Sequence, residues 1–271
     1  MTELTNKEFI QIRDYLKNTY GISLNDDKKG LVTSRLRTRL QDKGLSNYTD
    51  YFKFLTQDKT GMEAQFFINA LSTNHTFFMR EADHFDYLKD AALPWVEALA
   101  KDRDIRIWCA ASSSGEEPYT LQIIMQEYFQ MKPGWNTQLL ATDISEKVLN
   151  KAVHGLYSNE SLSALPAAWR VKYFKKYNDE SMIATDELKR LIAFRKFNLM
   201  DEHFPFKRPF HIVFCRNVMI YFDPRTRDDL VKRFYDHMVP GGFLFIGHAE
   251  SLNQTNTQFK YDRPAVYRKP S

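Results

Sequence analysis

Apolar and polar residues alternate with the period of an α-helix along the first part of the chain. Between residues 6 and 20, apolar side chains recur every three or four positions, at Phe9, Ile12, Leu16 and Tyr20. Thr5 and Glu8 stand three residues apart at the start of this stripe, which is the pattern of a capping box. The pattern predicts an amphipathic helix that begins after Thr5.

A second helical pattern begins near Asn25, and one of its faces is basic. When its residues are placed at about 100° per position, four cations fall within a narrow arc. These cations are Lys28, Arg35, Arg39 and Lys43. Residues 46–55 and 62–71 predict two more helices, so residues 1–72 are expected to form a small all-α domain.

From about residue 82 the pattern changes to short apolar runs separated by helical stretches. Strands are predicted at residues 105–109, 138–142, 211–215 and 243–246, and helices at residues 116–129 and 228–238. Such alternation is typical of a parallel sheet with crossover helices. We therefore predict an α/β domain over residues 82–271, connected to the helical domain by a linker at residues 73–81.

Residues 157–199 interrupt the alternation of strands and helices. A short helix led by Pro166 is followed by alternating runs at residues 181–185 and 191–197. We interpret residues 157–197 as a small antiparallel β-subdomain inserted into the α/β domain.

Composition and charge narrow the class of protein. The 271 residues are 43% hydrophobic and 27% charged, which is typical of a globular protein. The chain lacks a membrane-spanning stretch and begins without the apolar core of a signal peptide, so we expect a cytoplasmic protein without membrane insertion. A net charge of +4 is too small for nucleic-acid binding through bulk charge, and we expect no nucleic-acid partner. Cys109 and Cys215 have no metal-binding spacing, and we expect no metal.

The turn after the first predicted strand is built from small residues. It reads AASSSGEEP at residues 110–118, and open α/β sheets bind ligands at this edge. Glu116 and Glu117 at the helix start disfavour a pyrophosphate by like charge. Asp143 ends the second predicted strand, where an acid commonly accepts hydrogen bonds from ribose hydroxyls, although it could equally cap the next helix. Together these features fit S-adenosylmethionine better than a dinucleotide.

Several runs now make the sequence resemble a known family. They are NHTFFMRE (74–81), AASSSGEEPYTLQI (110–123), ATDIS (141–145), FNL (197–199), FCRNVMIYFD (214–223) and GGFLFIGHAESL (241–252). In this order they resemble the chemotaxis receptor methyltransferase family, CheR. The resemblance implies an all-α domain followed by a class I S-adenosylmethionine-dependent methyltransferase domain of Rossmann-like α/β fold, with a small β-subdomain inserted.

The resemblance also implies site residues. Contacts with S-adenosylmethionine, or with its product S-adenosylhomocysteine, are implied for Asn74, Thr76, Arg80, Glu116, Asp143, Asn198, Leu199, Arg216 and Asn217. Arg80 and Tyr221 are our candidates for steering the substrate carboxylate, Arg80 by its charge and Tyr221 by its hydroxyl. Arg80 could instead form a surface ion pair, and Tyr221 could be a core residue.

The substrate implied by the resemblance is a glutamate side chain on the cytoplasmic helices of a chemoreceptor. Its carboxylate is already ionised at neutral pH, so forming the methyl ester requires no general base. The basic face of Lys28, Arg35, Arg39 and Lys43 is complementary to acidic helices, although it could also be a solvated face. Residues 175–190 contain no glycine, whereas some members bind a receptor tail pentapeptide through a glycine-rich hairpin. Tail binding is therefore in doubt for this chain.

Two other functions remain compatible with the generic motifs. A class I methyltransferase that acts on RNA or a small molecule would share the cofactor-binding turn. A non-catalytic signalling adaptor would bind S-adenosylmethionine without turnover. Because the motifs with Arg80, Asp143 and Asn217 are intact, we expect an active enzyme, and we expect it to be a monomer.

Overall fold

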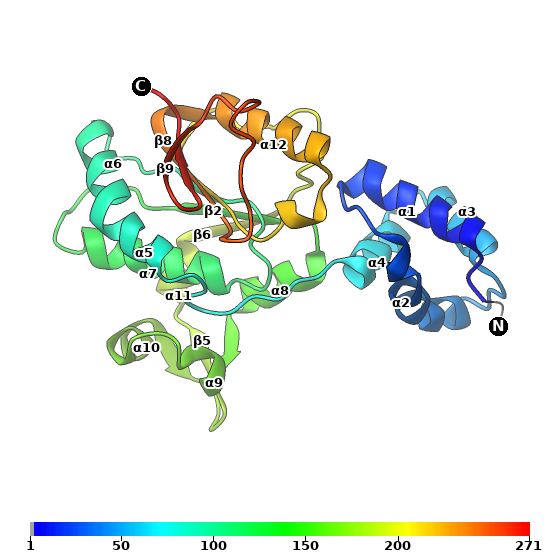
Figure 1. Ribbon diagram of the computed structural model, residues 1–271. Helices are drawn as coiled ribbons and strands as arrows, with labels where there is room; N and C mark the ends of the chain where they lie inside the picture. The colour runs from blue at the N-terminus through cyan, green and yellow to red at the C-terminus, as the bar shows by residue number, and fades with distance from the viewer. Residues whose placement is uncertain (1–2) are drawn as a thin grey trace.

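The computed structural model describes residues 3–271, in which a helical bundle stands beside a larger α/β body (Figure 1). The bundle consists of α1 (Asn6–Tyr20), the 3-10 turn η1 (Asp26–Lys28), α2 (Lys29–Asp42), α3 (Tyr48–Gln57) and α4 (Met62–Leu71). This is the all-α domain that the sequence predicts. Its helices share one apolar core, which includes Phe9, Ile12, Val32, Leu36, Tyr51 and Phe67.

The ends of α1 follow from local chemistry. The Thr5 hydroxyl accepts a hydrogen bond from the Glu8 N–H at 3.3 Å, and the Glu8 carboxylate accepts one from the Thr5 N–H at 2.9 Å. The predicted capping box is therefore present. At the other end, Gly21 adopts a left-handed conformation with φ of 74° and ends the helix.

The α/β body is built on a sheet with strand order β6-β2-β1-β7-β8-β10-β9. Its strands are β1 (Ile107–Cys109), β2 (Leu139–Asp143), β6 (Ile192–Lys196), β7 (Phe210–Cys215), β8 (Met238–Ile246), β9 (Lys260–Arg263) and β10 (Val266–Arg268). The first five strands in this order, β6, β2, β1, β7 and β8, each pair in parallel with the next. Strand β10 runs antiparallel to both β8 and β9. The parallel centre confirms the α/β prediction.

Helices cover both faces of this sheet (Figure 1). They are α5 (Asp83–Tyr87), the π-helical turn η2 (Leu88–Ala92), α6 (Leu93–Leu99), α7 (Glu116–Phe129), α8 (Glu146–His154) and α12 (Pro224–Asp236). Successive residues of a strand point to opposite faces, so Ile107 packs in the core beneath α7 while Trp108 packs in the core beneath α12. Both faces are buried, which explains why the central strands are continuous apolar runs.

One predicted strand belongs to a different sheet from the one expected. Residues 191–197 were assigned to the inserted β-subdomain, but β6 pairs in parallel with β2 from Leu139 to Asp143. The prediction was wrong because alternation in an edge strand of a parallel sheet looks the same as alternation in a hairpin. The small antiparallel sheet instead has the order β3-β5-β4.

The small sheet is accompanied by short helices and lies below the main body in Figure 1. Its strands are β3 (Leu156–Ser158), β4 (Phe174–Lys176) and β5 (Ser181–Ala184), and its helices are α9 (Asn159–Leu162), α10 (Ala167–Tyr173) and α11 (Asp186–Arg190). Because β5 is paired on both sides, only β3 and β4 present strand edges within this sheet.

Two boundaries differ from those predicted near the C-terminus. The helix expected at residues 228–238 begins at Pro224, because Asp223 caps it by accepting the Thr226 N–H at 2.8 Å. The strand expected at residues 243–246 begins earlier, at Met238, so β8 includes Gly241, which has φ of 78°. A Cβ at Gly241 would lie 2.5 Å from the Trp95 ring, so only glycine fits there. Among residues 3–271, no helix is long and apolar enough to cross a membrane.

Candidate functional site

A cavity of about 330 Å³ opens at the carboxyl edge of the central strands. Ala110 follows β1, Asp143 ends β2 and Arg216 follows β7, and all three line the cavity. The helical domain closes another side of the cavity with Tyr20 and Leu31. The site is therefore formed where the two domains meet, at the edge of the sheet where α/β folds bind ligands.

Direct contacts hold the helical domain over this edge. The backbone N–H of Ser23 donates to the Tyr221 carbonyl at 2.8 Å, and the amide of Asn198 donates to the Thr19 carbonyl at 2.8 Å. Lys17 Nζ lies 2.7 Å from Asp223 Oδ2. This contact and the cap of α12 lower the pKa of Asp223 to about 2.

The cavity wall contains most of the residues that the resemblance implies. Those that line it are Asn74, Thr76, Arg80, Asp143, Asn198, Leu199, Arg216 and Asn217, and our candidate Tyr221 lines it as well. They come from the linker, from the end of β2, from the segment after β6 and from the segment after β7. Segments far apart in the sequence thus meet in one cavity.

Asp143 is buried and partly engaged by the backbone. Its carboxylate accepts the Ser113 N–H at 2.9 Å and the Ser145 N–H at 2.9 Å. Burial raises its pKa, while these backbone donors act in the opposite direction. Asp143 thus fixes the turn after β1 against the start of α8, where Ser145 rather than Asp143 is the N-cap residue. The carboxylate still has lone pairs that can accept bonds from a ligand.

The turn after β1 passes very close to its neighbours. Gly115 has φ of 102°, and a Cβ at this position would lie 2.5 Å from the Tyr157 hydroxyl oxygen and 2.9 Å from the Ala152 Cβ. Tyr157 also donates its hydroxyl to the Ser114 carbonyl at 2.7 Å. A glycine is therefore required at this point for the turn to reach the start of α7.

The two glutamates at the start of α7 have different surroundings. Glu116 does not line the cavity; it is buried and accepts the Ser114 hydroxyl at 2.8 Å, and burial raises its pKa. Glu117 lines the cavity and accepts a hydrogen bond from Arg216 Nη1 at 2.8 Å. The resemblance implied Glu116 as a cofactor contact, whereas it is Glu117 that lines the cavity. Because the two acids are adjacent in the sequence, the direction in which α7 starts decides which of them faces the cavity.

The linker places Arg80 beside the cavity. Its Nη1 donates to the His75 carbonyl at 2.9 Å, and its Nη2 donates to the Asn217 side-chain oxygen at 2.8 Å. Its guanidinium lies 5.8 Å from the centre of the exposed Phe77 ring. The remaining donors of this planar group are suited to a carboxylate.

Arg216 forms the buried centre of an ionic network behind Arg80. Its side chain is 1% exposed and lies 3.0 Å from Glu81 Oε2 and 2.8 Å from Glu117 Oε2. It also donates to the Arg80 carbonyl. Burial alone would raise the pKa of Glu81, but the charge and hydrogen bonds of Arg216, together with donors from Asn217 and the His248 backbone, lower it. Arg216 thus joins the linker to the first turn of α7.

Glu250 shapes the loop that carries Asn217 and Tyr221. Its carboxylate accepts the N–H groups of Asn217 at 3.0 Å, Ile220 at 3.2 Å and Gly247 at 2.5 Å. Burial raises its pKa, and the backbone donors oppose this shift. Glu250 lies in a run that carries the family resemblance, but nothing in its spacing indicated which loop it would hold.

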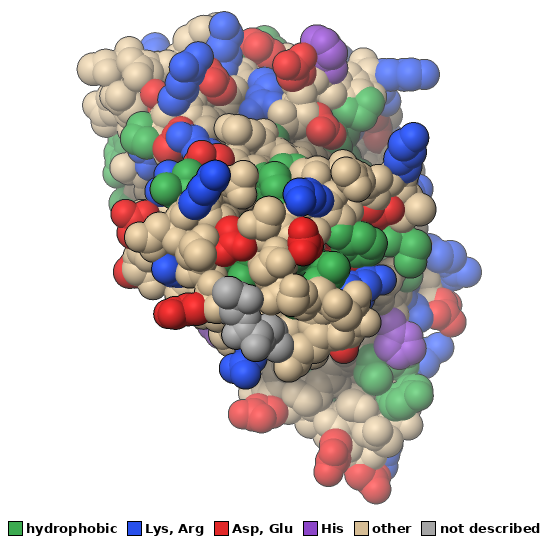
Figure 2. All heavy atoms as spheres, turned by 90° about the vertical axis from the view of Figure 1, so that its right-hand side faces the viewer, with side chains coloured by type: hydrophobic (Ala, Val, Ile, Leu, Met, Phe, Trp, Pro, Cys, Tyr) green, Lys and Arg blue, Asp and Glu red, His purple; other side chains and the backbone are tan. Residues whose placement is uncertain are grey.

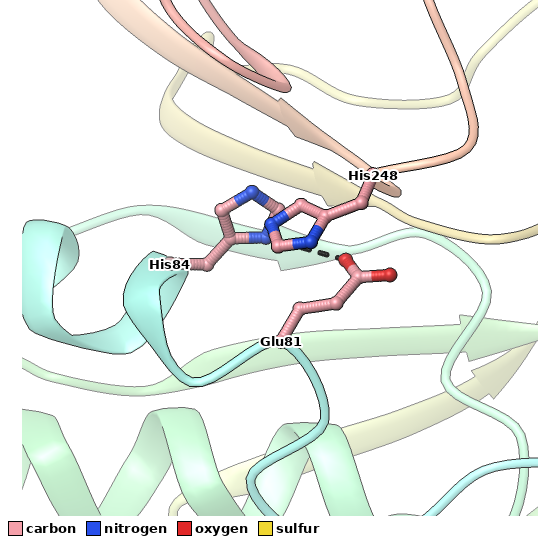
Figure 3. Close-up of side chains that lie close together, drawn as sticks. All are labelled: Glu81, His84 and His248. Carbon is pink, nitrogen blue, oxygen red and sulfur yellow. Dashed lines mark ion pairs between the residues drawn. The ribbon is translucent and has the colours of Figure 1, made fainter.

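Glu81, His84 and His248 turn one potential ligand atom each towards a common point (Figure 3). These atoms lie within 4.8 Å of one another. The carboxylate of Glu81, however, already accepts hydrogen bonds from Arg216 and Asn217. The Arg216 guanidinium lies 3.0 Å from the Glu81 carboxylate, and a positive charge so close repels a metal cation. We therefore interpret the cluster as part of the ionic network around Arg216.

The basic residues predicted on α2 and η1 divide into two pairs. Arg35 donates to the Ala70 and Ser72 carbonyls at 3.1 Å, and Arg39 pairs with Glu63, so both contact the end or the side of α4. Lys28 and Lys43 are exposed. Figure 2 shows acidic side chains interspersed among the basic ones on the face turned towards the viewer.

Comparison with known proteins gives two family models that together span nearly the whole chain. "CheR methyltransferase, all-alpha domain" matches residues 7–72, and "CheR methyltransferase, SAM binding domain" matches residues 74–266. The chain is 39% identical to the chemotaxis protein methyltransferase of Borreliella burgdorferi, over 98% of this chain and 95% of that protein. It is 35% identical to the chemotaxis protein methyltransferase of Salmonella typhimurium, over 97% and 90% of the two chains.

Proposed function

The chain belongs to the CheR methyltransferase family, and from that premise we propose that it methylates glutamate γ-carboxylates on the cytoplasmic helices of chemoreceptors. The family match confirms the predicted fold class and the predicted cofactor, S-adenosylmethionine. It also identifies the chain as a methyltransferase of chemotaxis and does not favour an RNA methyltransferase or an adaptor. The glutamate substrate and the receptor partner belong to our proposal.

The cavity fits the cofactor by its donor set and size. Its volume of about 330 Å³ lies within the range of small-molecule sites. Asp143 offers an acceptor at the end of β2 that suits ribose hydroxyls. Asn198 and Leu199 lie on the same wall, where they can contact a base edge and a base face. When bound, S-adenosylmethionine supplies the methyl group on a sulfonium.

The observation that carries the proposal is the placement of Arg80 at the cavity, held by Asn217 and the His75 carbonyl. A planar cation in this position can orient a substrate carboxylate while its own geometry stays fixed. Tyr221, on the same wall, can add a hydrogen bond from its hydroxyl. Since a glutamate is ionised at neutral pH, these residues need only align it and exclude water.

Receptor capture is proposed to depend on charge rather than on a tail tether. The exposed cations Lys28 and Lys43 can attract acidic receptor helices. Residues 177–180 between β4 and β5 contain no glycine, and we do not propose a pentapeptide site on the small sheet. We also propose that the enzyme acts as a monomer in the cytoplasm, where these receptor helices lie.

The proposal is tested by incubating the protein with receptor-containing membranes and methyl-labelled S-adenosylmethionine. Glutamate methyl esters release their label in base, so base-labile label in the receptor band is the expected result. Arg80→Ala should retain its fold by circular dichroism and lose most of this transfer. Label that resists base, or no receptor labelling by the unaltered protein, would show that the proposed substrate is wrong.

A further inference from the structure

Glu81 follows Arg80 directly and pairs with Arg216, and it also contacts the residue that holds Arg80. The Asn217 side-chain N–H donates to Glu81 Oε1 at 3.2 Å, and the Asn217 side-chain oxygen accepts Arg80 Nη2 at 2.8 Å. Both Glu81, with φ of 55°, and Asn217, with φ of 58°, adopt left-handed backbone conformations, which are uncommon for glutamate and more readily adopted by asparagine. Such strained residues cluster at functional sites.

The chemistry of the two neighbours leaves the Asn217 amide a single orientation. Arg80 only donates hydrogen bonds, so the atom that faces it must be the oxygen. Ionised Glu81 only accepts hydrogen bonds, so the atom that faces it must be the nitrogen. The pKa of Glu81 is lowered, which keeps this carboxylate ionised. Because Glu81 accepts from the Asn217 nitrogen, the Asn217 oxygen is turned towards Arg80 and accepts its hydrogen bond.

Packing supports the same orientation. Gly247 lies against Asn217, and a Cβ at Gly247 would lie 2.9 Å from the side-chain carbon, the side-chain oxygen and the backbone nitrogen of Asn217. Glu250 holds the Asn217 backbone N–H at 3.0 Å. The backbone and one side of the amide are thus fixed, and Glu81 fixes its polarity.

We infer that Glu81 is a positioning residue, which sets the orientation of the Asn217 amide and thereby holds Arg80 in the geometry needed to orient a carboxylate. The inference rests on the proposed function, because it assigns Arg80 to the substrate or cofactor carboxylate. Glu81 itself does not line the cavity. It acts through Asn217, in the way that a carboxylate fixes the orientation of a catalytic group beside it.

A charge-conserving exchange tests this inference. Glu81→Gln leaves one acceptor oxygen for two donors, so its amide N–H faces the Asn217 N–H when its oxygen stays on Arg216. Asn217→Asp places a carboxylate against Glu81. Each single variant should lower kcat/KM for receptor methylation by about tenfold or more, as expected for a lost hydrogen bond to a charged group. In the double variant, the new amide at position 81 can donate to the new carboxylate at position 217, which can still accept from Arg80. Its kcat/KM should be about tenfold higher than the value expected if the two single losses multiplied.

A second substitution avoids disturbing the Glu81–Arg216 ion pair. Gly247→Ala brings a Cβ within 2.9 Å of both the side chain and the backbone nitrogen of Asn217, so it displaces the whole residue and should lower both kcat/KM and the melting temperature. Glu97→Gln is the matched control, because Glu97 also accepts two side-chain donors, Tyr128 at 2.6 Å and Lys132 at 2.7 Å, away from the cavity. It should leave kcat/KM unchanged.

The same cycle is also measured on the dissociation constant of S-adenosylhomocysteine. If the unaltered protein binds this product but does not methylate receptors, the proposed function fails and the cycle on binding still tests Glu81. Single losses that simply multiply in the double variant, on both readouts, would overturn the positioning role. So would unchanged activity and binding in Asn217→Asp.

Discussion

Arg39 holds the carboxylate of Glu63 between the second and fourth helices of the bundle. Its Nη2 lies 2.5 Å and its Nε 3.1 Å from Glu63 Oε2, and its guanidinium also lies 4.2 Å from the centre of the Phe66 ring. Glu63 is 2% exposed and accepts the Tyr51 hydroxyl at 3.0 Å. A cation that the helical pattern places on a docking face is thus already neutralised inside the domain.

Arg39→Ala should therefore destabilise the protein, because it leaves the Glu63 carboxylate buried without its cation. Breaking a buried ion pair in this way costs about 3–5 kcal/mol in the free energy of unfolding, and partial exposure of Arg39 favours the lower end. Denaturant unfolding measures the loss. Lys43→Ala, on the same helix end but exposed, should change stability by less than about 0.5 kcal/mol. Equal stabilities would contradict the structural role of Arg39.

Receptor docking is better tested at the exposed cations. Replacing Lys28 and Lys43 together with glutamate should slow receptor methylation, because the acidic receptor helix would be repelled during encounter. Raising salt should reduce the difference from the unaltered protein, since the Debye length falls to about 3 Å near 1 M salt. Lys101→Glu, an exposed change outside the helical domain, is the control and should have little effect. Unimpaired methylation by the double variant would refute a docking role for these lysines.

The adjacent glutamates of α7 offer a matched pair of substitutions. Glu117→Gln removes a charge that faces the cavity and pairs with Arg216, so binding of S-adenosylhomocysteine should weaken by about tenfold, or about 1.4 kcal/mol. Glu116→Gln makes the same chemical change outside the cavity wall and should leave affinity nearly unchanged. Calorimetry measures both. If Glu116→Gln weakened S-adenosylhomocysteine binding more than Glu117→Gln did, Glu116 would be the glutamate that contacts the cofactor.

The sequence predicts elements best where one local pattern dominates. The helix from Glu116 to Phe129 has the bounds expected from its periodicity, and the capping box at Thr5 and Glu8 fixes the start of α1. The carboxyl-edge position of Asp143 also follows from the strand that it ends. In each of these cases the deciding interaction lies within a few residues of chain.

Other features depend on contacts that no local pattern encodes. The partner of β6 is decided by the main sheet, and the partner of Arg39 comes from another helix. Glu117 rather than Glu116 faces the cavity because Gly115, at φ of 102°, sets the direction in which the helix starts. Glu81 and Glu250 were not singled out, because their roles arise only when loops distant in sequence meet.

Asp143→Ala should weaken S-adenosylhomocysteine binding by about 1–3 kcal/mol, because the ribose hydroxyls would lose a charged acceptor. The substitution also frees the Ser113 and Ser145 N–H groups, so a control for local damage is needed. Ser145→Ala removes the cap of α8 and leaves the carboxylate in place. Calorimetry on both variants separates these effects. Similar losses in both would assign Asp143 to the turn and not to the ribose.

His84 makes stability depend on pH in a defined range. Its side chain is 1% exposed, and neither ring nitrogen finds a hydrogen-bond partner among residues 3–271. Burial, followed by the positive charge of Arg216, lowers its pKa from 6.5 to about 4, against the opposing charges of Asp83 and Glu81. The folded state therefore resists a proton that the unfolded chain accepts below pH 6.5.

The free energy of unfolding should accordingly fall as the pH drops from about 6.5 to 4, by up to about 3 kcal/mol from this one group. His84→Leu removes the titrating ring and replaces nitrogens that make no hydrogen bond with apolar atoms, so it should cost little at pH 7. Chemical unfolding at several pH values should then show a shallower acid-side decline in the variant than in the unaltered protein. His211 and the carboxylates that do not face His84 titrate in both proteins and cancel in the comparison. Parallel stability curves across this range would show that His84 takes up its proton as readily in the folded state as in the unfolded chain.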